Sequence, residues 1–193
     1  ILTRLDLATR IKNKEERKKY LTFAIAGAGP TGVELSGIIA EMSTSVIVKD
    51  YPELTEKGLI EIYLIDGQES VLSAMSSSAQ KYATDKLHEY GVNLVMKTFV
   101  EDFDGEHVKL SNGNQISSKN LIWAAGVVAK TFKGFPEKSY GRGKRLKTNQ
   151  FNQVHFMDDV FALGDCAVMT SDDDYPDGHP QLAQPAIQQA KQL

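Results

Sequence analysis

The chain has 193 residues, of which 41% are hydrophobic and 24% are charged. This composition is typical of a globular protein and excludes an intrinsically disordered one. The net charge of −3 gives no sign of the basic surface that nucleic-acid binding requires. Cys166 is the single cysteine, so an intramolecular disulfide and a Cys-x-x-Cys redox pair within this chain are both excluded. No run of about 20 apolar residues is evident, so we expect no membrane-spanning helix.

The first half of the sequence predicts alternating helices and strands. Two short, continuous apolar runs end in glycine or aspartate, as strands buried on both faces of a parallel sheet do. The expected elements are a helix over 2–19, a strand over 21–27, a helix over 31–42, a strand over 60–66, a helix over 76–90 closed by Gly91, and a strand over 92–97. This order is that of a doubly wound nucleotide-binding fold.

The second half changes character. Short alternating runs broken by Asp-Gly and Asn-Gly predict a small antiparallel meander over 98–118. A buried strand over 120–126 follows, and a polar stretch rich in Gly and Lys up to about residue 150 indicates a domain crossing. The remainder predicts a strand over 158–165, an acidic loop over 171–180 and a helix that begins with Pro185 at its first position and Gln184 at its N-cap.

The stretch "FAIAGAGPTGVELSG" carries a G-x-G-x-x-G pattern between a strand and a helix. Gly27 permits the tight turn out of the strand, Gly29 lets a pyrophosphate approach the backbone, and Gly32 lets the helix pack close to the strand. The helix N-terminus then offers free N–H groups to the phosphates. The pattern therefore predicts dinucleotide binding, the alternative being a tight turn without a ligand.

Asp66 ends the second strand and is the candidate acid for the ribose hydroxyls. It lies farther from Gly32 than the usual 20 or so residues, because an insertion over 44–59 separates helix and strand. Gly67, Gln68 and Glu69 follow it, with no Arg or Lys for a 2′-phosphate, which favours NADH over NADPH. The alternative is that Asp66 only forms the turn after the strand.

Four stretches, "AGAGPTGVELSG", "LIWAAGV", "FALGDCA" and "AQPAIQQ", occur in this order and spacing in a known family. On these motifs the chain resembles the type II NADH dehydrogenases, which are single-chain, FAD-dependent NADH:quinone oxidoreductases. The resemblance covers essentially the whole chain. The implied fold class is α/β: a Rossmann-like parallel sheet with an antiparallel β-meander, plus part of a second, FAD-binding half-domain. Because residue 1 is not Met, we also expect the chain to be a fragment of a longer protein.

The resemblance implies a leading helix from the FAD side over 1–19, an NADH-binding domain over 20–128, and the C-terminal half of an FAD-binding domain over 129–193. The implied cofactors are NADH and FAD, and the implied electron acceptor is a quinone. The resemblance further implies peripheral attachment to the cytoplasmic face of a membrane through regions absent from this chain, and allows a homodimer. No nucleic-acid partner is expected. The chain alone is expected to be inactive.

Residue roles follow by position in the motifs. The resemblance implies catalytic roles for Glu34, Gln184 and Gln188. Glu34 would lie near the nicotinamide, unless it is only an acid favoured by the helix dipole. The two glutamines would border the quinone, unless they are surface residues. The implied cofactor-binding set is Gly27, Gly29, Pro30, Thr31, Gly32, Glu34, Asp66, Ala125, Gly126, Gly164, Asp165 and Gln184.

Further expectations concern other residues and the alternative functions. Ala125 and Gly126 are expected between nicotinamide and flavin, the alternative being plain sheet packing. The resemblance implies that Asp165 binds the FAD ribitol, and a carboxylate at the end of a buried strand favours a ligand role because it is costly unless paired. The four histidines lack metal-ligand spacing, and none is assigned to catalysis. The alternative functions are a disulfide or ferredoxin reductase of the same fold, or a non-catalytic NADH-binding redox sensor.

Overall fold

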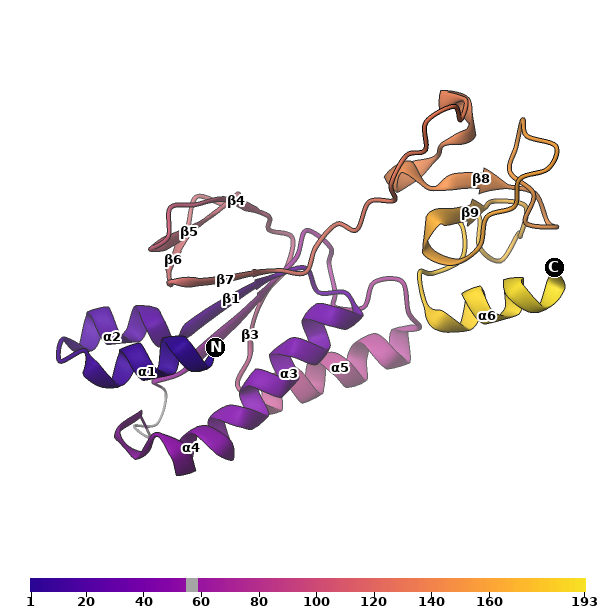
Figure 1. Ribbon diagram of the computed structural model, residues 1–193. Coiled ribbons are helices and arrows are strands. Elements are labelled where there is room, and N and C mark those ends of the chain that lie inside the picture. The colour runs from indigo at the N-terminus through magenta and orange to yellow at the C-terminus, as the bar shows by residue number, and fades with distance from the viewer. Residues whose placement is uncertain (55–58) are drawn as a thin grey trace. The chain divides into compact units, whose positions relative to one another are not determined.

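The computed structural model describes residues 1–54 and 59–193, which form two units, Ile1–Ala125 and Gly126–Leu193. The centre of the first unit is a parallel sheet with strand order β3-β2-β1-β7 (Figure 1). Its strands are β1 (Thr22–Ala26), β2 (Glu61–Ile65), β3 (Asn93–Val95) and β7 (Asn120–Trp123). The predicted parallel sheet is confirmed.

The sheet is covered on both faces, which explains its continuous apolar strands. Along β1, Phe23 and Ile25 belong to the core shared with helices α3 (Pro30–Thr44) and α5 (Ser77–Glu89), whereas Ala24 belongs to the opposite core. That opposite face is covered by the antiparallel meander (Figure 1). Its strands are β4 (Val100–Phe103), β5 (His107–Leu110) and β6 (Gln115–Ser117). The predicted meander is therefore confirmed as well.

The predicted helix over 2–19 is wrong in its continuity. The structure has two helices, α1 (Leu2–Arg10) and α2 (Lys14–Leu21). The break has a local cause, because the Asn13 side chain accepts a hydrogen bond from Glu16 N–H at 3.0 Å and so starts a new helix. Both helices belong to the first unit, where their buried residues pack against α4 (Val46–Asp50) and the 3₁₀ turn Pro52–Leu54.

The segment Pro30–Asp50 is long and apolar enough to cross a membrane, by length and composition alone, with a mean hydropathy of 1.2. The sequence had not led us to expect such a segment. It comprises α3 and α4. In the structure α3 buries Ser36, Ile39 and Ala40 in the first unit. This buried side contributes to the core that covers the parallel sheet, while Ile38, Val46 and Val48 of the same segment are exposed.

The second unit has little regular structure. It contains a two-stranded parallel pair, β8 (Leu146–Thr148) and β9 (Ala167–Met169), and the helix α6 (Ala183–Gln192). Three 3₁₀ turns complete it, at Glu137–Ser139, Arg142–Lys144 and Gly164–Cys166. The strand predicted over 158–165 is wrong, because this segment has one isolated bridge, between Gln153 and Phe161, and then turns at Gly164.

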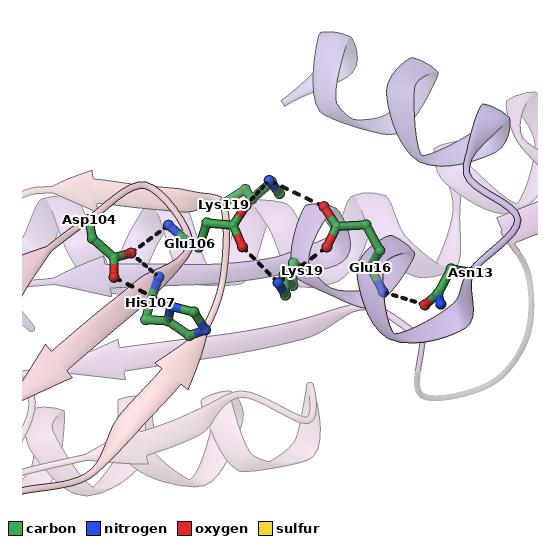
Figure 2. A network of polar contacts seen from close by, with 7 residues as sticks. All are labelled: Asn13, Glu16, Lys19, Asp104, Glu106, His107 and Lys119. Carbon is green, nitrogen blue, oxygen red and sulfur yellow. Dashed lines mark hydrogen bonds and ion pairs between the residues drawn. The ribbon is translucent and has the colours of Figure 1, made fainter.

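A polar network joins helix α2 to the meander (Figure 2). Glu106 accepts from Lys19 at 2.7 Å and from Lys119 at 2.6 Å, and both lysines also contact Glu16 at 3.2 Å. Asp104 orients the turn by accepting from the backbone N–H groups of Glu106 and His107. The hydrogen bonds from Lys119 and Lys19 lower the pKa of Glu106 to about 2.

This network predicts a pH-dependent effect of Glu106→Gln. Because the pKa of Glu106 is depressed on folding, the ionised carboxylate stabilises the folded state above about pH 4.5 and loses that contribution as the pH falls towards about 2. We expect the variant to unfold at lower temperature than the wild type at neutral pH, and the difference to vanish near pH 2. Circular dichroism recorded during heating measures this difference in unfolding temperature.

The matched control is Glu89→Gln, which removes the exposed Lys86–Glu89 pair on α5. Exposed ion pairs of this kind contribute little to stability, so this variant should have the same unfolding temperature as the wild type at every pH. A Glu106→Gln effect that does not change with pH would contradict the role assigned to the charge.

Candidate functional site

The glycine turn after β1 brings two backbones into contact. Gly27 has a φ of 105°, and a Cβ placed on it would lie 2.7 Å from the backbone nitrogen of Ala125. A Cβ on Gly32 would lie 1.8 Å from the carbonyl oxygen of Gly27. Both glycines are therefore required by the close approach of β1, β7 and α3.

Gly29 differs from its two neighbours in the motif, because a Cβ placed on it would meet nothing within 4 Å. It is the N-cap of α3, with Pro30 as the first helical residue, and no side chain caps this terminus. The first N–H groups of a helix have no acceptor within the helix. An open backbone surface at a positive helix end is suited to a phosphate group.

The carboxylate of Asp66 holds this turn. Its Oδ2 accepts a hydrogen bond from Ala28 N–H at 2.6 Å, and its Oδ1 accepts from Gln68 N–H at 2.8 Å. Asp66 thus has the turn-forming contacts that the sequence analysis kept as an alternative. Each carboxylate oxygen has a second acceptor position, so a hydrogen bond to a ribose hydroxyl remains chemically available beside the two backbone contacts.

Two further predicted residues of the first unit lie near the turn. Ala125 lies two residues beyond the end of β7, with its backbone against Gly27. Glu34 is exposed on α3, but the first turn of this helix holds no acidic residue. Because α3 starts at Pro30, Glu34 is the fifth helical residue and lies beyond the first turn. A simple helix-dipole role for Glu34 is weakened accordingly, since that effect fades beyond the first turn.

One basic residue near Asp66 was not predicted. The sequence shows no Arg or Lys among the residues that follow Asp66, but the structure places Lys97 there, with Nζ 2.5 Å from Glu69 Oε1. Lys97 follows β3, next to β2 in the sheet, so the fold joins segments that are far apart in the sequence. Lys97 could not be assigned to this site from the sequence, because the sequence does not show that β3 lies next to β2.

In the second unit, Gly164 and Asp165 form a tight turn. Gly164 has a φ of 65°, and its N–H donates to Gln189 Oε1 at 2.7 Å. Asp165 is exposed, so its predicted burial at a strand end is wrong; the strand is missing and the residue lies on the turn. Within the described part of the chain its carboxylate makes no hydrogen bond or ion pair. It can therefore accept hydrogen bonds from hydroxyl groups, as the ribitol of FAD would require.

Helix α6 begins two residues earlier than predicted. Its first residue is Ala183, so Gln184 is the second helical residue and Pro185 the third. Proline is tolerated there because the first N–H groups of a helix lack partners in any case. Gln184 and Gln188 are both exposed and one turn apart. The buried amide is Gln189, which the sequence analysis did not select.

A small cavity of about 230 Å³ lies beside α6, lined in part by Pro185, Gln188 and Gln189. His179 and Asp172 form a pair in its wall, with Nε2 and Oδ2 2.9 Å apart. The hydrogen bond from His179 lowers the pKa of Asp172. Among the described residues, no group of three His, Cys, Asp or Glu side chains is placed to hold a metal ion.

Residues 1–190 match the pyridine nucleotide-disulphide oxidoreductase family. The chain belongs to this family. The predicted fold class, a Rossmann-like α/β fold with an antiparallel meander, is therefore confirmed.

Two relatives agree with the predicted resemblance. The chain is 32% identical to the type II NADH:quinone oxidoreductase Ndh of Mycobacterium tuberculosis, over 99% of this chain and 41% of that protein. It is 28% identical to the mitochondrial external alternative NAD(P)H-ubiquinone oxidoreductase B3 of Arabidopsis thaliana, over 81% of this chain and 28% of that protein. The chain thus spans well under half the length of these relatives.

A solved structure gives the same result. NDH2 from Plasmodium falciparum in complex with NADH superposes with a TM-score of 0.74, at 26% identity, covering 88% of this chain and 36% of that one. The resemblance to type II NADH dehydrogenases that the four motifs predicted is confirmed.

The glycines of α3 allow fold and ligand roles to be separated. Gly29→Ala should leave the free energy of unfolding unchanged within about 0.5 kcal/mol, because the new methyl group meets nothing. The same methyl group occupies the surface assigned to the pyrophosphate, so we expect NADH affinity to fall by about tenfold or more. Gly32→Ala should destabilise the fold, because its Cβ collides with the Gly27 carbonyl. Urea unfolding and calorimetric titration with NADH measure the two effects.

Gly37→Ala is the matched control, since Gly37 lies in the same helix with open space around it. It should gain up to about 1 kcal/mol from helix propensity and bind NADH as the wild type does. Normal NADH binding by Gly29→Ala would contradict the assignment of the phosphate site.

Proposed function

We propose that this chain is the NADH-binding part of an FAD-dependent NADH:quinone oxidoreductase. The observation that carries the proposal is the open backbone at Gly29, at the uncapped N-terminus of α3 and beside the Asp66 carboxylate. In parallel α/β sheets, ligands bind at this edge, beyond the carboxyl ends of the strands. The family match and the names of the relatives support the same function.

In this proposal the NADH pyrophosphate lies on the turn from Gly27 to Gly32, where Pro30 and Thr31 open the helix. The adenosine ribose donates a hydrogen bond to Asp66. The nicotinamide extends towards Glu34, Ala125 and Gly126. Support comes from the partial positive charge of the α3 N-terminus, which suits an anionic group, and from the second acceptor position on each Asp66 oxygen.

The flavin would be held in part by the turn at Gly164 and Asp165. The exposed carboxylate of Asp165 suits a polyhydroxyl chain, and the hydrogen bond from Gly164 N–H to Gln189 fixes the turn that presents it. FAD bound there would supply the redox chemistry by which the hydride of NADH reaches a quinone as two electrons and two protons, one of them taken up from water. The protein's task is then to position the groups and to tune the charge around them.

Gln184 and Gln188 are the proposed contacts to the quinone headgroup, because their exposed amides offer both donors and acceptors. The assignment of 20–128 as the NADH domain and of 129–193 as part of the FAD domain belongs to the same proposal. So do peripheral attachment to the cytoplasmic face of a membrane and assembly as a homodimer. The "AQPAIQQ" stretch favours this function over a disulfide reductase, a ferredoxin reductase or a redox sensor.

The neighbouring amides Gln188 and Gln189 give a test in the flavin-loaded protein. Gln188→Ala should lower quinone-dependent turnover several-fold, while the rate of flavin reduction by NADH stays nearly unchanged. Gln189→Ala should lower flavin content and slow both half-reactions, because it releases the Gly164 turn. Anaerobic stopped-flow absorbance and steady-state turnover with a soluble quinone distinguish these effects.

Equal slowing of both half-reactions by Gln188→Ala would show that this side chain holds the flavin or the fold. If neither half-reaction changed, the quinone contact would be wrong.

A further inference from the structure

The loops that follow β2 and β3 are joined at the edge of the sheet that holds Asp66. Thr98 N–H donates to Asp66 O at 3.0 Å, and Lys97 N–H donates to Gln68 O at 2.9 Å. Gln68 N–H in turn donates to the Asp66 carboxylate. One residue, Gln68, therefore links the backbone of Lys97 to the proposed ribose-binding carboxylate through its N–H and its C=O.

The loop that carries Lys97 is held in a defined conformation. Lys97 has a φ of 54°, in the left-handed region that non-glycine residues seldom adopt. Two residues on, the backbone of Phe99 is bonded on both sides to Ser111, with Phe99 N–H donating to Ser111 Oγ and Ser111 N–H donating to Phe99 O, both at 2.9 Å. These bonds fix the place from which the Lys97 side chain extends.

Phe99 also marks the surface beside Asp66. Its ring packs on Gly67, where an added Cβ would lie 2.0 Å from the ring, yet 64% of the residue is exposed. An exposed aromatic ring held next to a ribose-binding acid offers an apolar face to the adenosine end of a dinucleotide. Lys97 precedes Phe99 by two residues, so its cationic side chain extends from the same short loop as the exposed ring.

Lys97 is paired with Glu69, and both side chains are largely exposed, at 67% and 82%. A pair so exposed to water is weak, so a group of higher negative charge competes for the lysine. The 2′-phosphate of NADPH is a phosphate monoester, which carries about −1.5 to −2 charges at neutral pH. Glu69 disfavours binding of the 2′-phosphate in two ways: it is already paired with Lys97, and its own negative charge repels the phosphate.

We propose that the Glu69–Lys97 pair sets the nucleotide preference of this site, with Glu69 withholding Lys97 from the 2′-phosphate of NADPH. The inference rests on the proposed NADH site and goes beyond Asp66. NADH lacks the 2′-phosphate, so it binds without engaging Lys97. NADPH binds only weakly while Glu69 is ionised, and loss of the Glu69 charge makes Lys97 a phosphate ligand.

The test is calorimetric titration of the chain with NADH and with NADPH. Glu69→Gln should raise NADPH affinity about fivefold and change NADH affinity by less than about twofold. The gain should shrink at high ionic strength, because both contributions are electrostatic and exposed. In Glu69→Gln combined with Lys97→Gln, the gain should be lost.

Asp85→Asn is the matched control, since it removes the same charge from an exposed pair with Lys81 on α5. It should leave both affinities unchanged. An equal effect of Glu69→Gln on the two nucleotides, or a gain that persists without Lys97, would overturn the inference while leaving the NADH site intact. A wild-type chain that binds no NADH would overturn the proposed function and this inference together.

Discussion

The contact between the backbones of Gly27 and Gly32 is the constraint on which the first unit depends. With no side chain between them, helix α3 starts against the end of β1, and the same turn lies against the end of β7. This closeness brings the α3 N-terminus, Asp66 and the β7 end to one edge of the sheet. A methyl group at Gly32 would separate these parts, and the proposed phosphate surface at Gly29 would lose its geometry.

Asp66 connects this constraint to the proposed nucleotide site. Its carboxylate accepts hydrogen bonds from two backbone N–H groups, and these bonds fix its orientation before any ligand binds. A residue held in this way is preorganised, and a ligand does not have to order it. The same bonds mean that a substitution of Asp66 changes the turn and the ligand contact together. Changes at Glu69 and Lys97 leave the turn bonds in place, which makes them cleaner probes of nucleotide choice.

The sequence predicted the elements whose signals are local. The strands β1 and β2 are continuous apolar runs because both faces of the sheet are covered, and Gly91 ends α5 with a φ of 75°. The errors arose where short-range signals compete. Asn13 caps a second helix inside an apparently continuous pattern, and the segment over 158–165 lacks a partner strand despite its apolar residues.

The residues that sequence reasoning missed depend on distant parts of the chain. Lys97 comes to Glu69 only because β3 lies next to β2. Gln189 could have been found from the helical period, since it follows Gln188 on a different face of α6, but its partner Gly164 is 25 residues away. Pattern and motif locate the glycine turn and the acid that follows β2. The three-dimensional pairing decides which amide supports the Gly164 turn and which lysine pairs with Glu69.

The most direct test of the central claim is an NMR titration of the chain with NADH, with the backbone amide signals assigned. If the glycine turn binds the pyrophosphate, the largest shifts will fall on the amides from Ala28 to Gly32, with smaller ones at Asp66 and Ala125. Largest shifts on the far face of the sheet or in the meander, or no shifts at all, would contradict the account.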